Sequence, residues 1–529
     1  MSLILSNEAD CLYCYKCLRN CPVKSISFCS GETRVIEEEC IHCARCVSVC
    51  PQGAKRYVQH VEQFRKLMHT TPFLVSLAPS FFAHYDEPYR VISLLKSWGA
   101  MIVQEAAFGA EIVSKKYMDL FNQKEMLITT ACPVVVELAE KHYPSVLPYL
   151  AHVDSPISAH AKFLKKFYGD LPVVFLGPCV AKKTEESVDV VLTFEELDNI
   201  VREEQIDLSL FDEQLPSPPY PYRARMYPTS GGINYTVHGD FETHIVVEGV
   251  EYLIDLFENF DPTQGKIFIE ASACHGGCIN GPAIRKDLSL AEKRFRMVRH
   301  VQKMLCFGSE PFHADMNIER SFSVKRRPVR VDETKIEEIL KEMGKEDERK
   351  RLNCGACGYD SCRDKAVAVL LGRAEKEMCV TYLVDKLKSA THRVVEESPN
   401  AIFMVKEGSI VYRNKTASTL FRNDSEEKFI DELKQAFLKG QPVQIGSNLY
   451  YVKFFVLPEE KADVFLLVDI TKEKQQEETL KRIKRETLYK VEEMLSKQMR
   501  VVQEVAGLLG ETVAEIKSSF FELRRSLEE

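Results

Sequence analysis

The sequence predicts a multidomain protein with α+β and α/β parts. Its 529 residues exceed the roughly 250 to 300 residues at which a single core stops growing. Between residues 72 and 310, short β-branched apolar runs alternate with helical segments, which is typical of α/β architecture with strands that end at functional loops. Eighteen cysteines in short spaced groups indicate metal-binding domains rather than a disulfide framework.

The composition is that of a soluble globular protein, with 45% hydrophobic and 28% charged residues. A net charge of −8 gives no electrostatic reason to expect nucleic acid or an anionic membrane as a partner. No apolar run approaches the roughly 18 residues of a membrane span, and the N-terminus lacks the pattern of a signal peptide. We therefore expect a cytoplasmic protein that binds neither nucleic acid nor membrane.

The first sixty residues contain one cysteine pattern twice. CLYCYKCLRNCP and CIHCARCVSVCP both follow the spacing C-x2-C-x2-C-x3-C-P, in which the fourth cysteine ligates the other cluster of a pair. Zinc is the alternative, but zinc sites pair C-x2-C units across a longer gap. Residues 1–62 resemble a two-cluster bacterial ferredoxin, which implies electron relay. The pattern predicts one 4Fe–4S cluster on Cys11, Cys14, Cys17 and Cys50, and another on Cys40, Cys43, Cys46 and Cys21.

Four further cysteines follow strand-like runs. The runs FLVSLAPS, MLITTACP, PVVFLGPC and KIFIEASAC read as strands, and each of the last three ends on a cysteine. If these strands are neighbours, Cys132, Cys179, Cys274 and Cys278 converge at their ends, and four thiolates at one place indicate a metal cluster. The alternative is four unrelated buried cysteines, since a lone cysteine is usually packing.

Residues 63–325 resemble the FeFe (iron-only) hydrogenases. The three cluster signatures of that family read here TTACPVVVE, GPCVAKKTE and EASACHGGCINGP. The resemblance implies that Cys132, Cys179, Cys274 and Cys278 ligate a 4Fe–4S cubane. It also implies that Cys278 bridges to a two-iron unit carrying CO and cyanide, and that Lys182 donates a hydrogen bond to a cyanide.

Three residues depart from the family's pattern, all at the expected two-iron pocket. Ala131 replaces the cysteine that passes protons, while Gly177 and Ser272 replace methionines that precede the second and third ligands. These changes leave the cubane ligands intact and disable the usual proton route, so we expect slow turnover. The alternative is an ordinary hydrogenase in which another group carries the protons. The residues expected to shape catalysis are Cys278, Lys182, Ala131, Gly177 and Ser272.

A fourth iron–sulfur site is predicted in residues 326–384. NCGACGYDSC followed by MC resembles the small single-cluster domains of redox and corrinoid proteins, with zinc as the alternative. Cys29 and Cys306 have no cysteine partner, and we expect them to be packing residues. The expected ligands of the C-terminal cluster are Cys354, Cys357, Cys362 and Cys379.

Residues 385–474 resemble a PAS domain. ESPNAIFMVKEGSIVYRNKTASTLF contains two alternating runs joined by a turn, and YYVKFFVLPEEKADVFLLVDITKEK contains another hairpin-like pair. VDITKEK matches the way such domains continue into a signalling helix. We see no residue that would attach haem or flavin, because the segment has no cysteine after Cys379 and His392 precedes the core. The unit is therefore expected to relay rather than to sense.

Residues 475–529 are predicted to form a signalling helix or coiled coil. One heptad position is apolar throughout, and its companion is often polar, which favours a parallel homodimeric seam that changes register easily. The glycines at 507 and 510 predict a break near LLGE. The alternative is an amphipathic helix packed on the PAS core. The apolar series is Leu488, Leu495, Val502, Leu509, Ile516 and Leu523, and the companions are Val491, Gln498, Val505, Thr512 and Ser519.

Together these parts predict a sensory FeFe hydrogenase, in which slow and reversible hydrogen oxidation is coupled through iron–sulfur clusters to PAS-mediated signalling. The implied partners are H2 and protons, an electron-transfer partner or a downstream kinase or phosphatase, and a second copy of the chain. One alternative is a catalytic hydrogenase with an accessory tail, against which the PAS domain, the coil and Ala131 argue. Another is a non-catalytic iron–sulfur scaffold without the two-iron unit, against which Lys182 and the CHGGC stretch argue.

Overall fold

The computed structural model describes residues 2–237, 243–307, 316–326, 329–421 and 425–527. The chain forms two compact units, Met1–Leu383 and Val384–Glu529. Within the described ranges, no helix combines the length and the apolar character that a bilayer span requires. The multidomain α/β prediction is confirmed by two parallel sheets in the first unit.

The N-terminal part contains two small antiparallel pairs and two short helices. The helices α1 (Lys16–Arg19) and α2 (Arg45–Val49) occupy the same place in the two cysteine repeats. Tyr13 and Tyr15 have φ values of 51° and 55°, and their counterparts His42 and Ala44 have 54° and 56°. The repeated sequence therefore folds into a repeated backbone. The pairs are β1 (Ile4–Ser6) with β4 (Lys55–Tyr57), and β2 (Ile26–Cys29) with β3 (Glu32–Val35).

Two parallel sheets form the centre of the first unit. The four predicted runs all contain strands, and those strands are divided between the two sheets. The larger sheet has the order β6-β5-β8-β9, spanning Ala100–Glu105, Phe73–Leu77, Val173–Gly177 and Val190–Thr193. The smaller sheet has the order β10-β11-β7, spanning His244–Glu248, Ile267–Ser272 and Met126–Ile128.

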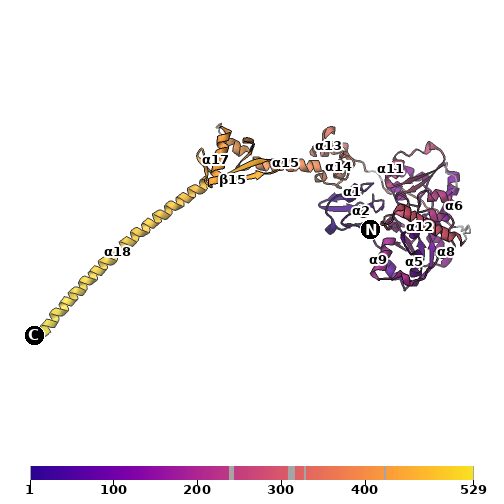
Figure 1. The fold of residues 1–529 in the computed structure, drawn as a ribbon, viewed down its shortest axis with the longest axis horizontal. Coiled ribbons are helices and arrows are strands. Elements are labelled where there is room, and N and C mark those ends of the chain that lie inside the picture. Colours follow the sequence, from indigo (N-terminus) through magenta and orange to yellow (C-terminus); the bar gives the residue numbers. More distant parts are fainter. Residues whose placement is uncertain (1, 238–242, 308–315, 327–328, 422–424, 528–529) are drawn as a thin grey trace. The chain divides into compact units, whose positions relative to one another are not determined.

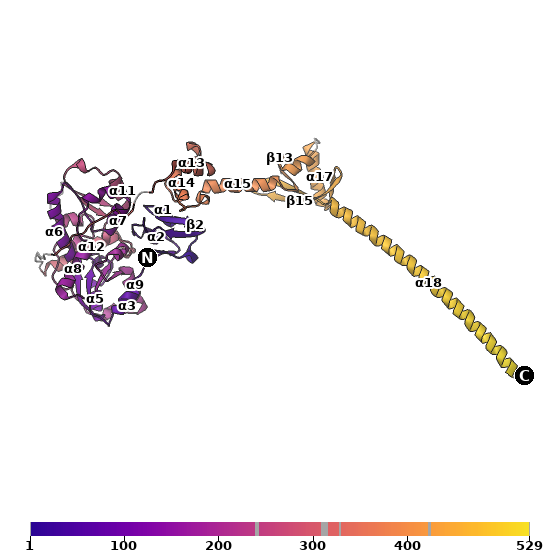
Figure 2. The same ribbon diagram turned by 180° about the vertical axis from the view of Figure 1, so that it is seen from behind.

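Helices cover these sheets, as Figures 1 and 2 show from opposite sides, with α12 lying between α11 and the group α5, α8 and α9. Every residue of β5 and of β8 is buried, as expected for parallel strands with both faces covered. The main helices are α5 (Pro88–Ser97), α6 (Ala107–Gln123), α7 (Pro133–Lys141), α8 (Pro156–Tyr168), α9 (Phe194–Glu203), α11 (Val250–Glu258) and α12 (Leu290–Leu305).

The C-terminal part of the first unit contains α13 (Glu333–Glu342) and α14 (Cys362–Leu370), which pack against each other. Its last loop leads into α15 (Val380–Glu396). The Cys29 thiol lies against this part, where it donates to the Gly372 carbonyl at 2.8 Å. Cys306 is exposed at the end of α12, so the prediction that it is a packing residue is wrong.

The second unit is built on one antiparallel sheet of order β13-β12-β16-β15-β14. Both predicted hairpins are present, and the turn of the first has φ values of 51° at Glu407 and 83° at Gly408. The strands are β12 (Ala401–Lys406), β13 (Ser409–Arg413), β14 (Val443–Ile445), β15 (Asn448–Leu457) and β16 (Ala462–Asp469), and α16 (Lys415–Leu420) and α17 (Glu426–Lys439) lie between β13 and β14 in the chain.

The chain ends in α18 (Thr471–Leu527), a single helix of 57 residues (Figure 1). It continues through Gly507 and Gly510, so the predicted break near LLGE is wrong. Every described side chain of α18 from Lys472 to Glu522 is exposed. The alternative of a helix packed along the sheet therefore does not describe this segment.

A buried ion pair joins β6 to two distant segments of the first unit. The Glu105 carboxylate accepts hydrogen bonds from Arg225 Nε at 2.9 Å and Nη2 at 2.8 Å, and His300 Nε2 lies 3.2 Å away. Burial raises the pKa of Glu105, but His300 and Arg225 outweigh it, and the pKa is lowered. The three side chains fix β6, η5 (Ala224–Met226) and α12 to one another.

Replacing Arg225 by Met should destabilise the first unit by about 3 to 5 kcal/mol, because it leaves the Glu105 charge buried without its guanidinium partner. Equilibrium urea unfolding measures the loss, and hydrogen exchange of β6 and α12 locates it. Arg65→Met is the matched control, since its pairing with Glu203 lies at the surface and should matter little. If Arg225→Met were as stable as the unmodified protein, the ion pair between Arg225 and Glu105 would not have this role.

Candidate metal centre

The four hydrogenase-type cysteines lie in loops that follow strands of both sheets. Cys132 directly precedes α7, whose first residue is Pro133. Cys179 precedes the short helix η3 (Val180–Thr184), and Cys278 begins η7 (Cys278–Asn280). Cys274 follows β11 by two residues. Loops at the carboxyl ends of parallel strands from both sheets therefore carry the four thiols.

The structure brings the four thiols into one neighbourhood. Cys132, Cys179 and Cys278 line a cavity of about 110 Å³. Burial and the nearby thiols Cys278, Cys179 and Cys132 raise the pKa of Cys274 well above its usual value. Burial also raises the pKa of Cys179 to about 11 and that of Cys278 to about 12. A bound metal deprotonates such thiols outright, so this donor set fits a metal cluster.

The thiols border a space rather than converge on a point. Within the described ranges, no three His, Cys, Asp or Glu side chains are placed to hold a single metal ion. The wall of the cavity is mostly apolar, which is typical of a cofactor site with a few fixed polar groups. The polar or charged side chains in the wall, apart from the cysteines, are Ser80, Lys182, Tyr227, Thr229, Glu270 and Ser272.

Lys182 is held at the wall by two contacts. Its Nζ donates to the carbonyl oxygen of Ala131 at 3.0 Å and pairs with Glu185 Oε1 at 3.2 Å. Glu185 also accepts from Ser158 Oγ at 2.9 Å. Burial raises the pKa of Glu185, but Lys182 and Arg320 outweigh it, and the pKa is lowered. The lysine therefore joins the loop of the first ligand to the loop of the second.

The three residues that depart from the hydrogenase pattern are placed differently. Ala131 and Ser272 line the cavity, whereas Gly177 is not part of its wall. A Cβ at Gly177 would lie 2.4 Å from the ring of Phe175, and Phe175 does line the cavity. The ring of Phe175 therefore takes the space that a side chain at 177 would need.

Two residues of the wall were missed by the sequence analysis. Ser80 has a buried Oγ without a hydrogen-bond partner in the described part of the chain. Glu270 accepts from the backbone N–H groups of Gly231 at 2.9 Å and Asn234 at 2.8 Å, and burial raises its pKa to about 7. In the sequence, Glu270 could have been recognised as a site residue because it is a charged residue inside the apolar run KIFIEASAC.

The CHGGC turn depends on its two glycines. Gly276 and Gly277 have φ values of 82° and 83°, a region that residues with a Cβ rarely adopt. A Cβ at Gly277 would also lie 2.4 Å from the carbonyl oxygen of Pro228, which is part of the cavity wall. The turn between Cys274 and Cys278 thus packs directly on the opposite side of the cavity.

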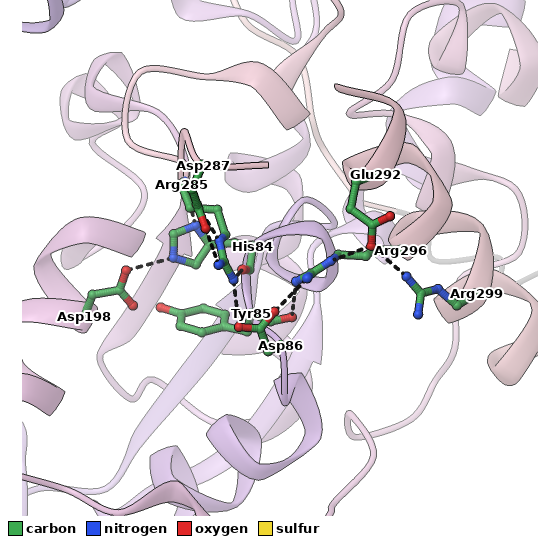
Figure 3. A network of polar contacts seen from close by, with 9 residues as sticks. All are labelled: His84, Tyr85, Asp86, Asp198, Arg285, Asp287, Glu292, Arg296 and Arg299. Carbon is green, nitrogen blue, oxygen red and sulfur yellow. Dashed lines mark hydrogen bonds and ion pairs between the residues drawn. The ribbon is translucent and has the colours of Figure 1, made fainter. Parts of the chain in front are cut away.

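A polar network fixes the segment that follows Cys278 (Figure 3). Arg285 pairs with Asp86 at 2.9 Å, and its backbone N–H donates to His84 Nδ1 at 3.0 Å. His84 belongs to α4 (Phe81–His84), which begins directly after Ser80. Arg296 of α12 also pairs with Asp86, at 2.7 Å. The network therefore holds two sides of the cavity at a fixed separation.

The ferredoxin-like part packs against the loops of this centre. Ile41 and Cys43 belong to the same apolar cluster as Cys132 and Cys179. His42 lies 2.7 Å from Glu137 of α7, and Lys141 Nζ of the same helix donates to the Cys40 carbonyl at 2.5 Å. The helix that follows Cys132 therefore also holds the loop of Cys40, an expected ferredoxin-type ligand. The expected cluster on Cys21, Cys40, Cys43 and Cys46 lies next to the candidate centre.

The C-terminal cysteines form a second group on the other side of the ferredoxin-like part. Cys354, Cys357, Cys362 and Cys379 line one small pocket. Tyr359 packs in one apolar cluster with Leu18 and with Cys17 and Cys21, which are expected ferredoxin-type ligands. The backbone N–H of Phe28 donates to Arg373 O at 2.8 Å, and Figures 1 and 2 both show α14 beside α1.

The fold and these groups of thiols define a protein with several iron–sulfur clusters. Residues 71–282 match the family model described as iron only hydrogenase large subunit, C-terminal domain. Residues 3–57 match a 4Fe-4S dicluster domain, and residues 351–381 match a putative Fe-S cluster domain. The chain is therefore a hydrogenase-like iron–sulfur protein related to the FeFe hydrogenases.

Curated relatives are similar at low identity. Iron hydrogenase 1 of Clostridium pasteurianum is 22% identical over 283 residues, covering 39% of this chain and 49% of that protein. The NADP-reducing hydrogenase subunit HndD of Solidesulfovibrio fructosivorans is 25% identical over 256 residues, covering 37% and 44%. The cytosolic Fe-S cluster assembly factor NAR1 of Vanderwaltozyma polyspora is 32% identical over 124 residues, covering 22% and 23%. The chain spans about half the length of the two hydrogenases that it matches.

Solved structures of [FeFe]-hydrogenases also align with the chain. The structure of HydA1 from Chlamydomonas reinhardtii has a TM-score of 0.39 at 16% identity, covering 51% of this chain and 100% of that chain. A TM-score of this size supports no conclusion about function.

Proposed function

We propose that the protein is a cytoplasmic sensory FeFe hydrogenase that oxidises hydrogen slowly and reversibly and passes the electrons to a signalling module. The observation that carries this proposal is the cavity beside the four thiols, in which Cys278, Lys182 and Ser80 meet. A protein that carries only a cubane needs the four thiolates. It does not need the additional cavity, with the Lys182 ammonium and the Ser80 hydroxyl in its wall.

The residues present fit a two-iron unit with CO and cyanide ligands, held by Cys278. When bound, that unit supplies the hydrogen chemistry. The Lys182 ammonium is kept at the wall by Ala131 and Glu185, where it can donate to an anionic ligand. The Ser80 hydroxyl offers a second hydrogen-bonding group. The rest of the wall is mostly apolar and includes Phe175 and Ile157.

Proton transfer is the weak step of this site. Ala131 lines the cavity and has no group that holds a proton. Glu270 is the one carboxylic acid in the described wall, and its pKa of about 7 lets it hold and release a proton at neutral pH. Its two backbone N–H bonds fix its position, so it cannot swing freely to deliver that proton. Slow turnover follows from this arrangement.

A PAS module is the proposed receiver of the signal. The sheet of the second unit has the strand order second, first, fifth, fourth, third, with two helices between its second and third strands in the chain. This topology supports a PAS-type unit. Helix α15 starts directly after Cys379, and α18 starts directly after β16. Helices at both ends suit a unit that passes on a conformational bias.

A parallel homodimer is the proposed assembly, with a kinase or phosphatase as the downstream partner. Helix α18 exposes every member of the apolar heptad series from Leu488 to Ile516. Helix α15 exposes Val380, Leu383, Val384, Leu387 and Val394, which recur at intervals of three, four and seven residues. Exposed stripes at coiled-coil spacing are stabilised by a second helix.

Two other functions remain as alternatives. A catalytic hydrogenase with an accessory tail is favoured by the similarity to Iron hydrogenase 1, whose name describes an enzyme. An iron–sulfur scaffold is favoured by the similarity to a protein named as an Fe-S cluster assembly factor. The three following predictions separate these alternatives.

Infrared spectra of the protein matured with FeFe-hydrogenase assembly enzymes should show CO and cyanide bands. Lys182→Met should lose most of that intensity while keeping the iron of the cubanes, because the variant removes the hydrogen-bond donor and leaves the four thiols. Lys286→Met, at an exposed position, is the control. A spectrum without these bands, from protein that contains its cubanes, would assign the chain to the scaffolds.

Hydrogen turnover should be limited by proton transfer and should rise at least about tenfold in Ala131→Cys, because a proton relay normally contributes 10²- to 10⁴-fold. Ala131→Ser is the matched control, since a hydroxyl of similar size is a far weaker acid. Rates with their solvent isotope effects measure both. The proposal fails if the wild-type protein turns over as fast as FeFe hydrogenases in the same assay.

Cysteines introduced at Val502 or Leu509 should crosslink between two chains, at rates that differ between hydrogen-reduced and oxidised protein. Arg500→Cys, outside the seam, should crosslink poorly, and the unmodified chain controls for exposed Cys306. Crosslinking on non-reducing gels gives the rates. A monomer in both states, or a dimer that reacts equally in both, would favour the plain enzyme.

A further inference from the structure

The pocket of the C-terminal cysteines contains two buried lysines. Lys365 is 1% exposed and Lys345 is 4% exposed, and both line the pocket with Cys354, Cys357, Cys362 and Cys379. No carboxylate lines this pocket in the described part of the chain, and neither lysine forms an ion pair there.

The contacts of the two ammonium groups are with neutral atoms. Lys365 Nζ lies 3.0 Å from Met378 Sδ and 5.2 Å from the centre of the Tyr359 ring. Lys345 Nζ donates to Thr381 Oγ1 at 3.0 Å, and that hydroxyl lies 3.3 Å from Cys379 Sγ. Both cations are therefore held close to expected cluster ligands.

Burying an ammonium without a counter-ion is costly. Burial lowers the pKa of Lys365, while the nearby Cys357, Cys379 and Glu375 oppose that change. Two ammonium groups at 1% and 4% exposure lie beside four thiols, and no carboxylate of the described chain lines the pocket with them. The pocket therefore favours an anion next to these lysines, and a cubane held by four thiolates carries net negative charge.

The ferredoxin-like part is different. There, Lys55 is the buried cation, and its Nζ donates to the Thr33 carbonyl at 3.1 Å. The thiols that act on its pKa belong to both expected clusters, namely Cys17, Cys46, Cys11 and Cys50. Lys141 also reaches this part, where its Nζ donates to the Cys40 carbonyl, but it pairs with Glu137 at 3.3 Å. In the described part of the chain, one buried lysine without an ion pair therefore serves the two ferredoxin-type clusters, whereas two such lysines serve one cluster at the C-terminal pocket.

We infer that Lys345 and Lys365 make the C-terminal 4Fe–4S cluster the electron acceptor of the chain, by raising its reduction potential above those of the two ferredoxin clusters. Reduction adds one negative charge to the cluster, and two nearby cations in a poorly solvated pocket favour that added charge. This inference rests on the proposed function for the source of the electrons.

The transfer step moves one electron. The cluster on Cys21, Cys40, Cys43 and Cys46 is oxidised by one electron, and the C-terminal cluster is reduced by one electron. No bond is formed or broken, and both lysines stay protonated. The two clusters are close because Tyr359 packs with Cys21, and because Gly358 has no Cβ, which would lie 2.1 Å from Leu18 Cδ2.

The direction of electron transfer determines where in the molecule the added charge is held. Cys379 directly precedes α15, the helix that leads into the second unit. An electron retained by this cluster changes the charge beside the first turn of α15. Raising the potential of this cluster therefore holds the reduced state where the signalling helix begins.

The test is a redox titration of the full chain, reconstituted with iron and sulfide but without the two-iron unit and followed by electron paramagnetic resonance. Cys357→Ala identifies the signal of the C-terminal cluster by its loss. At a fixed potential, Lys365→Met and Lys345→Met should each lower the ratio of reduced to oxidised C-terminal cluster at least tenfold, which is 59 mV for one electron. Lys365→Arg should stay within threefold of wild type.

Lys376→Met is the matched control, because Lys376 is in the same part of the chain but pairs with Glu342 at the surface. Lys376→Met should change the ratio of reduced to oxidised C-terminal cluster less than twofold. The reduction potentials of the ferredoxin clusters should be the same in all lysine variants. Iron content confirms that each variant holds its clusters. The inference is overturned if both Met variants stay within twofold of wild type, or if the wild-type C-terminal cluster is harder to reduce than the ferredoxin clusters. Neither result depends on hydrogen turnover, so a failure here is distinct from a failure of the proposed function.

Discussion

Four thiols from loops of two different sheets must stay side by side next to one mostly apolar cavity. Burial alone would not keep them there, since it raises the pKa of Cys179, Cys274 and Cys278 and so disfavours their ionised form. Buried polar contacts fix the loops instead: Lys182 joins the first ligand loop to Glu185, and Arg285 joins the segment after Cys278 to α4. The attraction within such contacts offsets little more than the cost of removing the charged groups from water. These contacts therefore fix the positions of the loops more than they stabilise the fold.

Polar contacts also determine which groups of cysteines lie next to one another. Helix α7 begins at the first hydrogenase-type ligand, and its other residues Glu137 and Lys141 hold the ferredoxin loop around Cys40. On the far side, Tyr359 and Gly358 bring the C-terminal pocket against α1. A line of thiol groups thus runs from the candidate centre, through the ferredoxin-like part, to the start of α15.

We infer that the buried lysines give electron transfer along that line a direction. A cation in a poorly solvated place changes the energy of a nearby electron much more than a surface charge does. Lys55, Lys345 and Lys365 are buried beside expected ligands, and none of the three forms an ion pair in the described part of the chain. The number of these lysines differs from one expected cluster to another. That difference depends on side chains that are far apart in the sequence.

The sequence by itself determined the parts that depend on local spacing. The cysteine repeats, the four strand-like runs and the two hairpins are local patterns, and each has its expected structure. The long helix follows from its heptads, although the two glycines did not break it, because about 1 kcal/mol each is small beside the cooperativity of a helix of 57 residues. Only the tertiary structure decided which strands share a sheet, that Phe175 takes the place of a side chain at 177, and that Ser80 and Glu270 reach the cavity. It also decided that Lys345 and Lys365 enter one pocket. These features depend on contacts between residues distant in the chain, and such contacts follow from the packing of whole sheets and helices rather than from the spacing of neighbouring residues.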